Sequence, residues 1–243
     1  MTYCVGLLLD SGLVMASDSR TNAGVDHVSI FPKMTVFSQA GERVITLATS
    51  GNLAISQAVL NHLNRAIREG VEPNLMSVGS MFEAAQVVGQ AIRAVHHSDS
   101  EALRKHQTEF LQAILLGGQI RGEAPRLFNI YAAGNFIEAC AQTPYFQIGE
   151  TKYGKPILDR VLNRVTSLDD AVKSILISFD STLRSNLSVG LPIDLLVYRL
   201  DSFEPERRRI TEDDAYFSQL RLSWSEGLRK VFASIPPAPW LGS

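Results

Sequence analysis

Short apolar runs separated by turn sequences dominate the first fifty residues of the chain. Residues 3–9 and 13–16 are almost entirely apolar and flank Asp10-Ser11-Gly12, which favours a tight turn between two strands. Residues 34–38 and 43–50 form a second pair of this kind. A strand that is apolar at nearly every position is typical of a sheet covered on both faces. The pattern predicts two β-hairpins in a sheet that lies between other layers.

Segments with apolar residues at helical spacing follow these hairpins. In the first of them Asn52 is a suitable N-cap and Gly70 a suitable C-terminal stop. Further helices are expected at residues 77–103, 153–165, 168–187 and 211–232. Further strands are expected at residues 110–119, 126–133, 137–142, 145–148 and 193–200. Runs of strands that alternate with pairs of helices predict an α+β fold, a four-layer αββα sandwich with two sheets between two helical layers.

The length and composition of the chain favour one domain. Its 243 residues, of which 45% are hydrophobic, are enough for a single ample core. We expect residues 1–203 to form the αββα core, 204–235 a C-terminal helical extension and 236–243 a tail. The charged stretch from Glu204 to Arg209 contains a proline and is interpreted as a solvated connector, with Thr211 as the N-cap of the last helix.

Charge and cysteine content narrow the function classes. A formal net charge of −2 and a pI of about 6.2 argue against a nucleic-acid partner or an anionic membrane surface. No apolar run is long enough to span a bilayer, so we expect a cytoplasmic protein without a membrane partner. Cys4 and Cys140 lie in apolar, strand-like contexts and are interpreted as buried thiols in a reducing compartment. No cofactor or metal site is expected, because the adjacent His96 and His97 do not share a helix face.

Thr2 is the candidate nucleophile. Removal of Met1 leaves a threonine whose hydroxyl and free α-amine belong to one residue. The hydroxyl alone is a weak nucleophile, but an α-amine titrates at about 7.7 to 8.0 and can accept its proton near neutral pH. A side chain as small as threonine at position 2 permits removal of the initiator methionine. Thr2 is therefore a nucleophile with its own base, and no histidine is required.

Asp18 and Lys33 are the candidate partners of Thr2. With the serine and glycine of the turn sequence at the centre of the first hairpin, Asp18 lies opposite Val5, and a three-residue loop places it opposite Cys4. Lys33 stands at the start of the next strand, where a buried ammonium needs a partner, and Asp18 is the available carboxylate. A lysine near Thr2 favours the neutral amine and the developing alkoxide. A solvated lysine at a strand end is the other interpretation.

Gly51 is the candidate oxyanion-binding residue. It lies at a strand-to-helix junction, where a glycine can leave its N–H unpaired beside the positive end of the helix dipole. A glycine selected only for the turn is the alternative. Thr49, two residues earlier, is a candidate for lining a pocket for the substrate side chain.

These residues resemble a known family. Thr2, the run Ala16-Ser17-Asp18-Ser19-Arg20 and Lys33 look like the threonine, aspartate and lysine pattern of proteasome-type peptidases, which are N-terminal nucleophile hydrolases. Within that group the chain most resembles the bacterial proteasome-like Anbu proteins, the ancestral β-subunit, and more distantly HslV. The resemblance implies a proteasome β-subunit-like fold, cleavage of peptide or protein substrates, and catalytic roles for Thr2, Asp18, Lys33 and Gly51. It also implies a homo-oligomer, either a ring or an open spiral. The sequence has no P-loop and does not reveal whether an unfolding ATPase is a partner.

The chain departs from the family pattern in two stretches. Proteasome-type subunits usually carry a supporting serine in a Gly-Ser-Gly turn, where this chain has Glu150. They also carry a late Asp-x-x-Ser-Gly segment, where Asn186 and Val189 replace the aspartate and the serine and Ser188 could act through a shifted register. Three functions therefore stay open. The favoured one is a threonine peptidase in a self-compartmentalising oligomer, and the alternatives are an amidase acting on a small amide and a non-catalytic ring or scaffold subunit.

Overall fold

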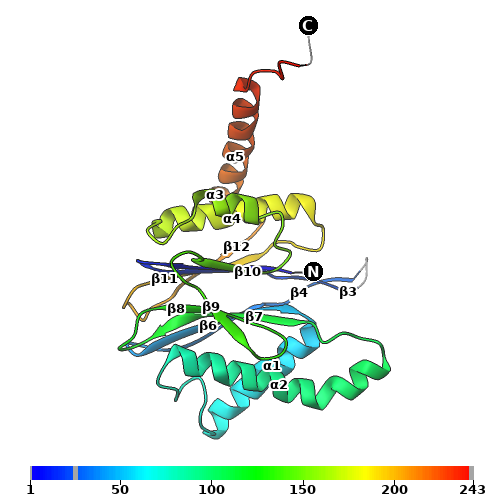
Figure 1. Ribbon diagram of the computed structural model, residues 1–243, viewed down its shortest axis with the longest axis vertical. Coiled ribbons are helices and arrows are strands. Elements are labelled where there is room, and N and C mark those ends of the chain that lie inside the picture. Colours follow the sequence, from blue (N-terminus) through cyan, green and yellow to red (C-terminus); the bar gives the residue numbers. More distant parts are fainter. Residues whose placement is uncertain (1, 24–26, 241–243) are drawn as a thin grey trace.

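A computed structural model describes residues 2–23 and 27–240 of the chain (Figure 1). Two five-stranded sheets face each other in it. The first sheet has the order β10-β1-β2-β11-β12, with strands Tyr145–Gly149, Tyr3–Leu9, Gly12–Asp18, Ile193–Arg199 and Glu206–Ile210. The second sheet has the order β5-β6-β7-β8-β9, with strands Met34–Gln39, Arg43–Gly51, Gln112–Ile120, Arg126–Ile130 and Phe136–Glu138. Strands β3 (Arg20–Ala23) and β4 (His27–Ile30) form a separate hairpin.

Helices cover both outer faces of the two sheets (Figure 1). Helices α1 (Leu53–Glu69) and α2 (Met81–Lys105) lie on the second sheet, and α3 (Lys155–Val161) and α4 (Leu168–Ser185) lie on the first. Helix α5 (Ala215–Ser234) projects from the α3 and α4 layer, away from the sheets. The predicted α+β fold with four αββα layers is confirmed.

Three apolar clusters fill the spaces between the four layers. One lies between the second sheet and helices α1 and α2, one between the first sheet and helices α3 to α5, and one between the two sheets. Strand β1 contributes to two of them, because Tyr3 and Val5 belong to the cluster under α4 while Cys4 and Leu8 belong to the cluster between the sheets. All seven residues of β1 are buried, which explains why this strand is apolar at nearly every position.

The first hairpin has a different register from either of the two expected. Leu9 pairs with Gly12 and Cys4 with Ser17, so the central turn residues are Asp10 and Ser11. Gly12 serves another purpose. Its φ is +142°, and a Cβ built on it would lie 1.9 Å from the carbonyl oxygen of Tyr198 on the adjacent strand β11. The glycine therefore permits close approach of β11, and Asp18 lies opposite Tyr3, one or two residues nearer to Thr2 than in the two expected registers.

The C-terminal third differs from the sequence interpretation in three respects. The expected solvated connector is largely strand β12, which pairs with β11, so the first sheet extends beyond residue 203. The N-cap of α5 is Asp214, whose side chain accepts a hydrogen bond from the N–H of Phe217, and not Thr211. The helix expected at 153–165 is limited to the seven residues of α3.

Two smaller features also differ from expectation. Cys4 is buried as expected, but Cys140 is exposed. The hairpin of β3 and β4 lies between the second strand and Lys33, where no strands were anticipated. The caps of α1 are those predicted, since the Asn52 side chain accepts from the N–H of Ala54 and Gly70 adopts a left-handed conformation with φ of +66°.

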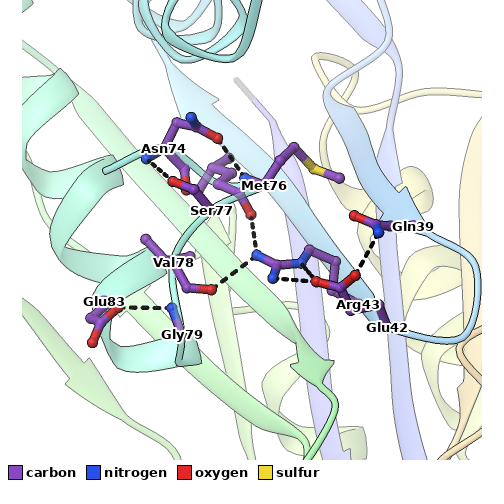
Figure 2. A network of polar contacts seen from close by, with 10 residues as sticks. Gln39, Glu42, Arg43, Asn74, Met76, Ser77, Val78, Gly79 and Glu83 are labelled. Atoms are coloured by element: carbon purple, nitrogen blue, oxygen red, sulfur yellow. Dashed lines mark hydrogen bonds and ion pairs between the residues drawn. The ribbon is translucent and has the colours of Figure 1, made fainter. Parts of the chain in front are cut away.

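A buried arginine fixes the connection between α1 and α2 (Figure 2). The guanidinium of Arg43, at the start of β6, donates to the carbonyl oxygens of Leu75 at 3.2 Å and Val78 at 2.9 Å. Its other side pairs with Glu42 at 2.7 Å. Each of these contacts pairs a guanidinium N–H with an acceptor. Two carbonyl oxygens and the Glu42 carboxylate therefore compensate the buried positive charge. The contact holds the segment before α2 against the second sheet.

Two properties of the described residues bear on function. Within residues 2–23 and 27–240, no helix combines the length and apolar character needed to cross a membrane. The same part of the chain has no group of three His, Cys, Asp or Glu side chains arranged to hold a metal ion.

Candidate active site

Thr2 directly precedes β1 and is 7% exposed. Side chains alternate along a strand, and Tyr3 points toward α4, where its ring packs against Phe179 at 4.6 Å between centroids. The side chain of Thr2 therefore lies on the opposite side of the sheet, with that of Cys4. It lines a cleft of about 580 Å³ together with Thr21, Lys33, Thr49, Gly51 and Ser56.

Lys33 and Asp18 form a buried ion pair beside Thr2. The Nζ atom of Lys33 lies 2.8 Å from Oδ1 of Asp18 and donates to the carbonyl oxygen of Arg20 at 2.5 Å. The same Oδ1 accepts the backbone N–H of Tyr3 at 3.0 Å, and Oδ2 accepts the N–H of Gly190 at 3.4 Å. Asp18 thus connects the strand that carries the nucleophile with the lysine that lines its cleft.

The protonation of Asp18 is set by opposing effects. Burial raises the pKa of the Asp18 carboxyl, and the Lys33 ammonium with the N–H groups of Tyr3 and Gly190 opposes that rise. Burial also raises the pKa of the Cys4 thiol and of the Tyr3 phenol well above their usual ranges. These two groups are therefore neutral at physiological pH and add no charge beside Thr2.

Gly51 closes the cleft at the end of β6. Its φ is +124°, and a Cβ at this position would lie 2.1 Å from the carbonyl oxygen of Leu111, so no other residue fits without a shift. The N–H of Asn52 donates to that carbonyl on the β7 side, whereas the N–H of Thr49 donates to Lys33 on the β5 side. By the alternation of an antiparallel ladder, the N–H of Gly51 is directed to the side on which Lys33 lies.

The two departures from the family pattern meet on the other side of Thr2. The backbone N–H of Glu150 donates to the carbonyl oxygen of Thr2 at 2.7 Å. The Nδ2 atom of Asn186 donates to Oε2 of Glu150 at 2.8 Å, and the Oδ1 atom of Asn186 accepts the N–H of Ser188 at 2.9 Å. Val189 is buried in the core under α4. Glu150 and Asn186 are therefore bonded to each other beside the nucleophile.

The structure brings the four sequence candidates together and adds others. Thr2, Lys33 and Gly51 line one cleft, and Asp18 lies behind Lys33. Sequence analysis missed Thr21, which lines the same cleft from the unanticipated strand β3, and Gly149, whose φ of +82° lets β10 approach Thr2. It also missed Gly190 as a donor to Asp18. The glycine that ends the Ser188-Val189-Gly190 stretch was the available signal for the last of these.

Solved structures match this chain over almost its whole length. Anbu (ancestral β-subunit) from Yersinia bercovieri is 54% identical, with 98% of each chain covered and a TM-score of 0.92. The chain belongs to the Anbu family. The helical assembly of the Anbu complex from Pseudomonas aeruginosa is 49% identical, with both chains fully covered and a TM-score of 0.95. Anbu from Hyphomicrobium sp. strain MC1 is 47% identical, with 98% of this chain and 99% of that chain covered and a TM-score of 0.89.

Membership of the Anbu family confirms the resemblance drawn from the N-terminal residues. Anbu proteins are proteasome-like, and the four-layer fold described above agrees with that relationship. No protein-family model matches the sequence, and no curated protein matches it.

Proposed function

We propose that this chain is a threonine-type peptidase that hydrolyses peptide bonds through Thr2, exposed by removal of Met1. Met1 lies outside the described residues, so its removal is part of the proposal. The observation that carries it is the position of Lys33, whose ammonium is fixed by Asp18 at 2.8 Å and lines the same cleft as Thr2. A fixed cation next to an α-amine lowers the pKa of the amine and stabilises a developing alkoxide.

The reaction proceeds in two stages. The α-amine of Thr2 takes the hydroxyl proton, and the hydroxyl oxygen forms a bond to the carbonyl carbon of the substrate. The N–H of Gly51 stabilises the negative charge on the carbonyl oxygen. The C–N bond then breaks, the leaving amine receives the proton held by the α-amine, and an ester to Thr2 remains. A water molecule, deprotonated by the same amine, then attacks the ester carbon; the C–O bond to Thr2 breaks, the threonine oxygen takes back the proton from the amine, and the carboxylic acid product leaves.

The proposal includes the assembly and the compartment. We infer that the chain forms one domain and assembles with copies of itself into a ring or open spiral in the cytoplasm. The helical assembly of the Anbu complex from Pseudomonas aeruginosa supports the assembly. So do the exposed apolar side chains along the projecting helix α5 and beyond it: Leu222, Leu228, Val231, Phe232, Ile235 and Trp240. A monomer in light scattering at micromolar concentration would contradict it.

The experiment combines intact mass with a covalent probe. A mature mass without Met1 is expected, followed by a single adduct with a peptide epoxyketone, which reacts with both the hydroxyl and the amine of a terminal threonine. Thr2→Ala keeps the amine and removes the hydroxyl together with the γ-methyl group, so it should give no such adduct and no hydrolysis. Thr211→Ala replaces an exposed threonine that does not line the cleft, so it is the matched control and should behave like the parent.

The outcomes separate the three functions. Undiminished hydrolysis in Thr2→Ala would place the nucleophile elsewhere. Adduct formation with turnover of small amides but not of peptides would favour the amidase. Retention of Met1, with no adduct, would leave the scaffold function, because the amine would then be blocked.

A further inference from the structure

Glu150 is a buried carboxylate beside Thr2 that the mechanism above does not use. The residue is 6% exposed. Its Oε2 accepts a hydrogen bond from the neutral amide of Asn186 at 2.8 Å, and its Oε1 lies 3.8 Å from Nζ of the exposed Lys152. An amide donor does not neutralise a buried carboxylate, and a solvated lysine at this distance contributes little. A cation within the site would therefore stabilise the buried Glu150 carboxylate.

The backbone ladder directs the Thr2 nitrogen toward Glu150. Tyr3 pairs with Gly149, and one step further the N–H of Glu150 donates to the carbonyl oxygen of Thr2 at 2.7 Å. In an antiparallel pair with this bond, the N–H of the first residue is directed toward the backbone of the second. The nitrogen of Thr2 therefore lies on the side of Glu150, and Lys33 lies on the cleft side of the same residue.

The mature N-terminus creates a cation at this point. Without Met1, the nitrogen of Thr2 becomes an ammonium, on a residue that is 7% exposed in the chain that still carries Met1. Burial of an ammonium is costly without a partner. Asp18 is already engaged by Lys33 at 2.8 Å, by the N–H of Tyr3 and by the N–H of Gly190. Glu150 is the nearby carboxylate whose ionic partner in the described residues is only the exposed Lys152.

We propose that the Glu150 carboxylate is the counter-ion of the Thr2 α-ammonium and that Glu150 is a positioning residue for the catalytic amine. The inference rests on the function proposed above. The charged groups around the amine are Glu150 after β10, Asp18 on β2, Lys33 before β5 and Arg20 on β3, whose guanidinium donates to the carbonyl of Leu187. An anion favours the charged amine, so Glu150 raises the pKa of the amine and Lys33 lowers it. The neutral Thr2 amine that hydrolysis requires therefore forms at higher pH when Glu150 is present than when its charge is removed.

The test measures the α-amine directly. The rate at which isotopically labelled acetic anhydride acylates the Thr2 amine is followed by mass spectrometry of the N-terminal peptide between pH 5 and 10. Glu150→Gln keeps the shape and the acceptor for Asn186 and removes the charge, and the titration midpoint should fall by about 1 pH unit. Asp10→Asn removes an exposed charge at the other end of β1 and should leave the midpoint unchanged. Glu150→Ser serves as the second neutral variant where Glu150→Gln does not fold.

Hydrolysis gives a second and independent readout. The acid limb of the pH–rate profile should move down with the midpoint in Glu150→Gln, a change that a merely structural role would not produce. Equal midpoints in parent and neutral variants would overturn the inference even where peptides are cleaved. A shifted midpoint without any hydrolysis would leave the inference intact and refute the proposed peptidase. Retention of Met1 in the mature chain would overturn both.

Discussion

Replacement of Lys33 by methionine is expected to leave an unpaired charge inside the protein. Asp18 has no exposed surface and the Lys33 side chain is 6% exposed, so the pair is buried. Loss of one partner of a buried pair costs about 3–5 kcal/mol of the free energy of unfolding. The N–H groups of Tyr3 and Gly190 still donate to Asp18 in Lys33→Met, which favours the lower end of that range. We expect a loss of about 3 kcal/mol at pH 8.

The loss should depend on pH. Burial raises the pKa of Asp18 and Lys33 opposes that rise, so removal of Lys33 raises the pKa further. A carboxyl with a pKa above its unfolded value binds more protons in the folded state, and the folded state then gains stability relative to the unfolded state as the pH falls. The difference between Lys33→Met and the parent should therefore shrink as the pH is lowered through the folded-state pKa of Asp18.

Urea unfolding, followed by tryptophan fluorescence at one fixed protein concentration, measures both effects. With a slope of about 1–3 kcal/mol per molar urea, the midpoint should fall by about 1 M or more at pH 8. Lys152→Met removes an exposed lysine and should change the free energy of unfolding by less than about 1 kcal/mol. The double variant Asp18→Asn with Lys33→Met should recover part of the loss. A loss below about 1 kcal/mol for Lys33→Met, or no recovery in the double variant, would refute the reasoning.

Three further predictions concern single sites. Gly51→Ala should lower the free energy of unfolding by about 1–3 kcal/mol, because the alanine Cβ would lie 2.1 Å from the carbonyl oxygen of Leu111 at a φ of +124°. Gly227→Ala in α5, where a Cβ meets nothing within 4 Å, should instead be neutral or stabilising, and the opposite ranking would refute the argument. Arg43→Met should make residues 71–79 more sensitive to limited proteolysis, since two carbonyl contacts are lost, and an unchanged digestion pattern would contradict this. A disulfide reagent at pH 8 should modify the exposed Cys140 and spare Cys4, whose pKa burial raises, until the protein unfolds, so a rapid reaction that persists in Cys140→Ser would count against the structure.

Local patterns in the sequence were enough to define the layers and the main candidates. The fully apolar run of β1 predicted a strand covered on both faces, and Asn52 and Gly70 predicted the two ends of α1. The apolar runs and helical periodicities predicted the αββα order, because the spacing of apolar residues along a strand or helix can be seen without knowledge of distant contacts. The pairing of Lys33 with Asp18 followed from the cost of a buried ammonium, and in the structure Nζ of Lys33 lies 2.8 Å from Oδ1 of Asp18.

Tertiary structure decided the features that depend on residues far apart in the chain. The register of the first hairpin was wrong in the sequence analysis because Gly12 is required by the backbone of Tyr198 and not by the turn. Strand β12 was interpreted as a connector because it contains three consecutive arginines, a composition typical of a solvated segment. It is an edge strand, and only its pairing with β11 identifies it as one. The donor from Gly190 to Asp18 and the bond between Asn186 and Glu150 join segments 172 and 36 residues apart. No local pattern encodes such contacts, because the packing of the two sheets and of the segment after α4 brings these residues together around Thr2.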